Sequence, residues 1–223
     1  MSNLRTGSYG NYYGSYYSQS VSLTTEQMNV NAFYIYKYLS AQGWTLQAIS
    51  GILGNIENES AINPGRWQSD DVGNLSGGYS LTQWTPASKY INWCSSQGYE
   101  DPSEMDNALA RIIYELENGG QYYPTSGYAE TFSEFSQSTK TPYYLACAFA
   151  WNYERSWTVL YGTDSEKEAL REKRGSSAEK WYTFLSGGET PDTPNPPNPT
   201  PGTRRKRRKY NFVLFTKRRW LQR

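Results

Sequence analysis

Apolar residues recur at intervals of three and four along most of the middle of this chain, which is the spacing of one face of an α-helix. In the first such segment they follow Thr25, a residue that can begin a helix: Met28, Ala32, Ile35 and Leu39. In the second they follow Thr45: Leu46, Ile49, Leu53 and Ile56. Further helices are indicated over residues 87–97, 105–118, 143–153 and 177–185. The hydrophobic pattern therefore predicts a mainly α fold.

Residues 63–84 interrupt this pattern. Residues 63–78 are rich in Gly, Asn, Ser and Asp, and residues 79–84 are the best candidate for a short strand or hairpin. We therefore expect a small β or irregular subregion within a helical domain.

Changes in composition divide the chain into four zones. Residues 1–22 are a polar, Tyr-, Gly- and Ser-rich arm of low complexity, which favours an extended segment, either a disordered leader or an arm that pairs with another chain. Residues 23–188 have the composition of one globular domain. Residues 189–202 are a Pro-rich linker, expected to be extended, and residues 203–223 are a basic tail.

The net charge of +1 conceals an uneven distribution. Ten of the 22 Lys and Arg residues follow Gly202, so residues 1–203 carry 12 positive against 21 negative charges, or −9. The basic tail could contact a polyanion such as teichoic acid or anionic lipid, or it is a solvated or non-native segment. We expect no specific nucleic-acid partner. No stretch reaches the ~18 apolar residues of a membrane span, and residues 1–22 lack the apolar centre of a signal peptide.

The chain contains no histidine. Its absence excludes Ser-His-Asp and Cys-His nucleophilic sites and His-based zinc sites, so carboxylates, tyrosines and lysines remain for acid–base chemistry. Cys94 and Cys147 are too few for a disulfide framework and are expected to be buried apolar residues, with a single bridge as the alternative. We expect neither a metal nor an organic cofactor.

The segment most suggestive of catalysis is residues 51–60, an apolar helix that ends with Glu57 and Glu59. The two carboxylates lie roughly 200° apart around a helix, and helical geometry alone does not choose between them. Glu59 is favoured because the loop after it can shield one side of its carboxyl. Partly dry surroundings disfavour the ionised form and raise a carboxyl pKa, as a general acid near neutral pH requires.

A series of short motifs in order runs through residues 28–188: Gly43-Trp44-Thr45, Gly54-Asn55, Glu59-Ser60, Ile62-Asn63-Pro64-Gly65, Gln83-Trp84-Thr85-Pro86 and Tyr153-Glu154-Arg155. In this series the chain resembles the tail lysozymes of bacteriophages, and in particular the lysozyme domain of the tail-knob peptidoglycan lysins of small short-tailed phages.

The resemblance implies a lysozyme-like fold and cleavage of peptidoglycan glycan strands between N-acetylmuramic acid and N-acetylglucosamine. It implies that Glu59 is the general acid and that Asp71, or its neighbour Asp70, is the second carboxylate that activates or orients water. It also implies that other residues bind the glycan: Tyr79, Gln83 and Trp84 on the cleft segment, and Tyr153 and Arg155 at the end of a helix behind it.

Three alternatives remain open at this point. Glu59 could act alone as acid and then base, as in lytic transglycosylases, which leave an anhydro sugar. The protein could also be a non-catalytic wall-binding module or a structural tail protein. In each case the resemblance implies a place in the virion, with phage tail proteins as partners.

Overall fold

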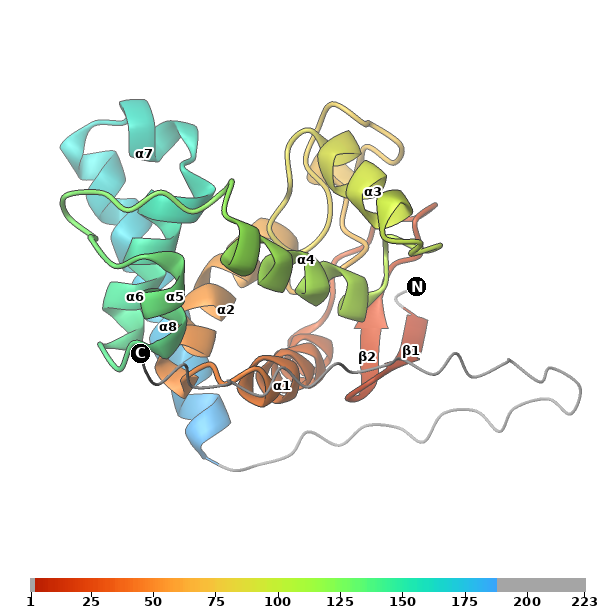
Figure 1. Cartoon of the computed structure of the whole chain (residues 1–223), viewed down its shortest axis with the longest axis horizontal. Helices are drawn as coiled ribbons and strands as arrows, with labels where there is room; N and C mark the ends of the chain where they lie inside the picture. The colour runs from red at the N-terminus through yellow and green to blue at the C-terminus, as the bar shows by residue number, and fades with distance from the viewer. Residues whose placement is uncertain (1–2, 188–223) are drawn as a thin grey trace, which may run out of the picture.

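The computed structural model describes residues 3–187, and the predicted linker and basic tail lie outside the described residues. The fold is mainly α, as predicted, and its helices follow one another in the order α1 (Thr25–Ala41), α2 (Leu46–Ser60), α3 (Ala87–Ser96), α4 (Met105–Asn118), α5 (Phe132–Gln137), α6 (Pro142–Phe149), α7 (Trp157–Tyr161) and α8 (Asp164–Ser186) (Figure 1). A 3-10 turn, η1 (Gln68–Asp70), precedes α3, and a π-helical turn, η2 (Ala150–Glu154), continues α6.

Helix α2 is the central element, because it packs against α1, α6 and α8. Its predicted apolar stripe is confirmed: Ile49, Leu53 and Ile56 are fully buried. Gly54 brings the α2 and α8 backbones together, since a Cβ atom at this position would lie 2.6 Å from the carbonyl oxygen of Arg174. This close crossing places the last turn of α2, which carries Glu59, beside α8.

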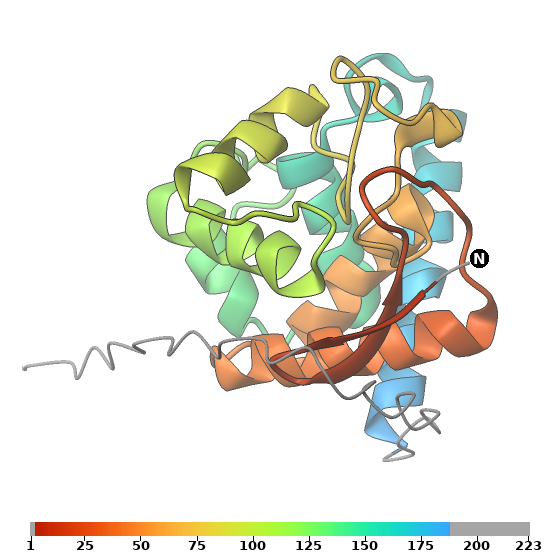
Figure 2. The ribbon, with the colours of Figure 1, turned by 90° about the vertical axis from the view of Figure 1, so that its right-hand side faces the viewer.

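The N-terminal segment is a packed β-hairpin rather than an extended arm. Strands β1 (Asn3–Gly7) and β2 (Gly10–Gly14) pair antiparallel, with Leu4 opposite Tyr13, and lie across α1 (Figure 2). Tyr12 is only 2% exposed. The expectation of a disordered leader is therefore wrong for residues 3–14, because the tyrosines of this low-complexity segment are packing residues.

A buried asparagine attaches the hairpin to α1. The Oδ1 atom of Asn31 accepts a hydrogen bond from the Tyr13 backbone N–H at 2.7 Å. Its Nδ2 atom donates to the carbonyl oxygens of Tyr13 and Ile62, both at 2.7 Å. One side chain thus connects the hairpin, α1 and the loop after α2.

Residues 63–84 form the predicted irregular subregion, which contains turns, η1 and isolated bridges in place of a strand. Tyr79 is at its centre, paired across single bridges with Trp67 and Trp84. Both cysteines are free and buried, which confirms the prediction that they are buried and rules out a bridge. Within residues 3–187, no helix combines the length and apolar character needed to cross a membrane.

Two helical segments differ from their predicted bounds. Helix α8 begins at Asp164, well before residue 177, with a capping box in which Thr163 and Glu166 satisfy each other's backbone groups. The helix predicted over residues 143–153 changes at Phe149 into the π turn η2.

Candidate active site

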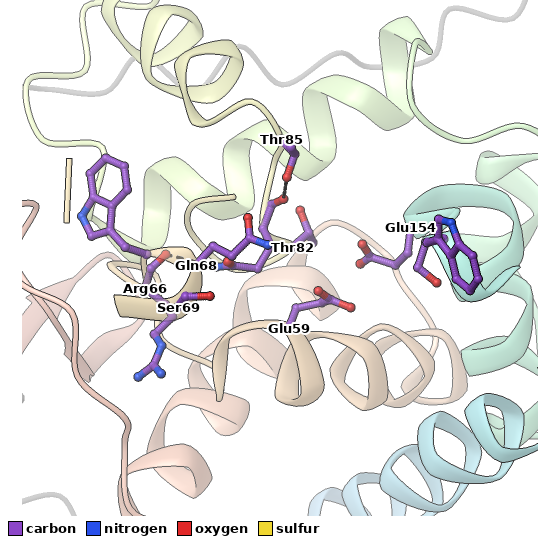
Figure 3. A pocket seen from close by; sticks show the side chains of 11 residues that line it. Glu59, Arg66, Gln68, Ser69, Thr82, Thr85 and Glu154 are labelled. Atoms are coloured by element: carbon purple, nitrogen blue, oxygen red, sulfur yellow. Dashed lines mark hydrogen bonds between the residues drawn. The ribbon is translucent and has the colours of Figure 1, made fainter. Parts of the chain in front are cut away.

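A cavity of about 460 Å³ lies between the end of α2, the loop around η1, residues 82–85 and the start of α7. It is lined by Glu59, Arg66, Trp67, Gln68, Ser69, Thr82, Gln83, Thr85, Glu154, Ser156 and Trp157. Two carboxylates project into it: Glu59 from α2 and Glu154 from the opposite side (Figure 3). The fold thus brings together two acids that are far apart in the sequence.

The carboxylate of Glu59 is paired with a cation. Its side chain is 20% exposed, and Oε1 accepts a hydrogen bond from Nη2 of Arg174 on α8. The same guanidinium donates from Nη1 to the carbonyl oxygen of Asn55 at 2.8 Å. Because Arg174 is itself buried, the ion pair is only weakly screened by solvent. Arg174 therefore fixes Glu59 in position and compensates its negative charge.

Glu154 has no such partner. Its Oε1 atom is buried and has no hydrogen-bond partner. Burial raises the pKa of Glu154 well above the usual value of a glutamate, the neighbouring charges of Glu59 and Glu115 add to this rise, and Arg174 opposes it. Glu154 therefore keeps its proton at pH values at which an ordinary glutamate has lost it.

The backbone around Glu154 explains how an acid reaches this place. Glu154 is the last residue of the π turn η2, and Arg155 follows in a left-handed conformation with φ of 49°. π turns are rare and occur often at functional sites. Here the turn directs Glu154 into the cavity.

The second carboxylate at the cavity is Glu154 and not Asp71. Asp71 is exposed in the loop after η1, where its Oδ2 accepts a hydrogen bond from Nδ2 of Asn74 at 3.0 Å, and it does not line the cavity. Asp70 is paired with Arg66 at 3.1 Å. The oxygens of both aspartates thus make contacts outside the cavity.

Of the residues predicted on the cleft segment, Gln83 lines the cavity, whereas Tyr79 and Trp84 do not. Nε2 of Gln83 donates to the carbonyl oxygens of Arg66 at 3.1 Å and Ser80 at 2.9 Å, which fixes its amide. Tyr79 is fully buried, and Trp84 is 3% exposed and stacks on Tyr90 at 4.5 Å. In this structure neither ring offers a free face to a sugar.

Tyr153 and Arg155, the residues before and after Glu154 in the sequence, point to different places. Tyr153 is buried, and its hydroxyl donates to Glu115 and accepts from Nε1 of Trp84 at 3.0 Å, so it supports the cavity wall from behind. Arg155 is exposed and its guanidinium lies 4.9 Å from the Tyr123 ring centre. It lines a neighbouring cavity instead of the one with Glu59.

Sequence reasoning missed Glu154, Arg174 and Trp157. Glu154 is within the Tyr153-Glu154-Arg155 motif, where a charge next to an arginine suggests an ordinary ion pair. The direction of the Glu154 side chain depends on the π turn, and the spacing of apolar residues in the sequence does not predict such a turn. Among residues 3–187 there is also no cluster of three or more His, Cys, Asp or Glu side chains suited to a metal ion.

Comparisons with known proteins agree with this architecture. The family model described as phage tail lysozyme matches residues 30–185. Morphogenesis protein 1 of Bacillus phage B103 is 42% identical over 172 residues, which make up 77% of this chain and 44% of that protein. The chain therefore spans less than half the length of this relative. Since the family model covers both Glu59 and Glu154 and most of the chain, the protein belongs to the phage tail lysozyme family.

Proposed function

We propose that this protein is a muramidase of a phage virion that cleaves peptidoglycan glycan strands between N-acetylmuramic acid and N-acetylglucosamine. The observation that carries the proposal is the pair of carboxyl groups in one cavity, Glu59 paired with Arg174 and Glu154 with a buried oxygen that has no hydrogen-bond partner. Glycosidases use such pairs, one acid to protonate the leaving oxygen and one carboxylate to stabilise or attack the sugar.

The surroundings of the two acids support a different role for each. Glu154, which holds its proton, donates it to the glycosidic oxygen as the bond to the anomeric carbon breaks. Glu59, held in place by its ion pair with Arg174, stabilises the positive charge that develops on the anomeric sugar. A water molecule then adds to the anomeric carbon and returns a proton to Glu154. In this proposal the proton donor is Glu154, whereas the resemblance implied Glu59.

Polar groups around the acids suit an N-acetylated sugar. Gln68, Ser69 and Thr85 line the cavity beside Gln83, and they present amide and hydroxyl groups. Such groups can hydrogen-bond sugar hydroxyls and acetamido groups. Membership of the phage tail lysozyme family and the name of the relative, a morphogenesis protein, support a place in the virion with phage tail proteins as partners.

Digestion of purified peptidoglycan tests the proposal. Wild-type protein is expected to release fragments with reducing ends, and Glu59→Gln and Glu154→Gln are each expected to lower the rate by about 10² to 10⁴, the usual contribution of acid–base catalysis. Asp71→Asn is the matched control, because Asp71 is an acid on the neighbouring loop outside the cavity, and it should keep a rate close to that of wild type.

The fragments also distinguish the alternatives. Mass analysis that finds 1,6-anhydro ends would identify a lytic transglycosylase. If folded wild-type protein releases no fragments, the proposal fails, and a wall-binding or structural role takes its place.

A further inference from the structure

A group of aromatic side chains is exposed beside the catalytic cavity. Trp157 and Tyr161 on α7 are 66% and 70% exposed, and Tyr123 is 51% exposed. The rings of Trp157 and Tyr161, both on α7, lie 6.1 Å apart between ring centres. Large aromatic residues exposed in a group usually mark a surface that binds something.

A second cavity lies on this side of the molecule. It has a volume of about 680 Å³, and Tyr123, Trp151, Arg155 and Leu160 are among the residues that line it. Ser156 and Trp157, the next two residues after Arg155, line the catalytic cavity. The two cavities are therefore adjacent, and residues 155–157 connect them.

The second cavity has one cation among its lining residues. The guanidinium of Arg155 lies 4.9 Å from the centre of the Tyr123 ring. Arg155 makes no ion pair with any carboxylate of residues 3–187. Arg155 is thus available to an anionic ligand.

We propose that α7 and Tyr123 form a second saccharide-binding site, which holds the part of the glycan strand that extends beyond the catalytic cavity. This proposal rests on the proposed function. A polymer threaded between Glu59 and Glu154 must leave their cavity, and Trp157 lies at its edge.

The chemistry of the site fits a peptidoglycan strand. Pyranose rings have faces of C–H groups that pack on indole and phenol rings, and the tyrosine hydroxyls can bond to sugar hydroxyls at the same time. Arg155 binds the carboxylates of the peptides attached to N-acetylmuramic acid, because a guanidinium forms paired hydrogen bonds with a carboxylate. The site therefore selects long strands, with peptides attached.

The test compares substrates of two lengths. Glycan strands are prepared from peptidoglycan as tetrasaccharides and as strands of eight or more sugars, with and without their peptides, and KM and kcat are measured on each. Wild-type protein is expected to have a lower KM for long strands. The variant Tyr123→Ala/Tyr161→Ala should raise the KM for long strands roughly five- to ten-fold, as expected for the loss of aromatic contacts, and raise it for tetrasaccharides less than two-fold.

Two further variants complete the test. Arg155→Gln should raise the KM only for strands that carry peptides. Tyr16→Ala is the control, because Tyr16 is also an exposed aromatic residue, at 46%, but lines a different cavity.

The inference is overturned if the double variant has the wild-type KM for long strands, or if it raises the KM equally for both lengths. A wild-type protein that cleaves neither length refutes the proposed function. In that case calorimetric titration of long strands into wild type and the double variant tests the binding site by itself, and equal affinities overturn it.

Discussion

Glu154 has an oxygen that is excluded from solvent and bonds to nothing in the described structure. A buried polar group without a partner costs about 1–3 kcal/mol of stability. Proteins retain such groups mainly where strain or unsatisfied polarity serves a function. The cost here is consistent with a proton that is held ready for transfer.

The raised pKa of Glu154 predicts how its replacement changes stability with pH. The usual pKa of a glutamate is 4.5, and above this pH the folded state binds more protons at Glu154 than the unfolded state does. The free energy of unfolding therefore falls as the pH rises from 4.5 toward the pKa of Glu154 in the folded protein. Glu154→Gln removes that dependence. Between pH 4 and 8 the Tm of the variant should therefore rise relative to the Tm of wild type as the pH rises. Parallel curves of Tm against pH over this range would show that folding does not raise the pKa of Glu154.

Two side chains show why the candidate site was only partly predictable. Glu59 was identified because it ends a strongly periodic helix, so both its element and its position can be read from local sequence. Trp84 was assigned to sugar binding through the family resemblance, and the local sequence does not distinguish a surface indole from a buried one. Its burial depends on Tyr90 and Tyr153, which come from separate parts of the chain.

Between helices, the crossing of α2 and α8 determines the geometry of the Glu59 and Arg174 pair. At Gly54 a Cβ atom would lie 2.6 Å from the Arg174 carbonyl oxygen and 2.8 Å from the Ala178 backbone nitrogen. Both atoms belong to the backbone, so they cannot rotate out of the way. Only a shift of one helix relative to the other could make room, and it would change the distance between Glu59 on α2 and Arg174 on α8.

We therefore expect Gly54→Ala to destabilise the protein by about 1–3 kcal/mol, the usual cost of overpacking, despite the better helix propensity of alanine. Urea denaturation measures the change. Gly127→Ala is the control, because a Cβ atom there would meet nothing within 4 Å. If Gly54→Ala is as stable as wild type, the two helices do not cross as closely as described.

The elements that the sequence predicted well are those with a continuous buried face. Helix α4 has the predicted range, 105–118, and α1 and α2 contain the apolar positions predicted for them. The first half of α8 is mostly exposed, so it has no apolar stripe, and its only local signal is the capping box at Thr163. Helix α7 is too short to show a period.

For the protein as a unit, the N-terminal hairpin joins parts of the chain that are distant in sequence. Nη2 of Arg5 pairs with Asp101 at 2.7 Å, and the backbone N–H of Ser8 donates to Asp106 at 2.9 Å. Asn31 attaches the other strand to α1. A composition-based boundary at residue 22 therefore does not separate a dispensable arm from the domain.

Asn31→Ala should lower the free energy of unfolding by about 1–3 kcal/mol, because it leaves part-buried backbone groups of Tyr13 and the buried carbonyl of Ile62 without the partner that Asn31 provides. Hydrogen exchange at the Tyr13 amide should become faster in the same variant. Asn118→Ala, at an exposed position, serves as the control. Unchanged exchange at Tyr13 would mean that other contacts hold the hairpin in place.

The π turn at the end of α6 directs two successive side chains into different cavities: Glu154 into the cavity with Glu59, and Arg155 into the neighbouring one. Deleting a single residue from this turn would restore regular helix and rotate everything after it by about 100°. The proposed cleavage and the proposed binding of the strand would then be lost together, because both depend on the backbone register of this one turn.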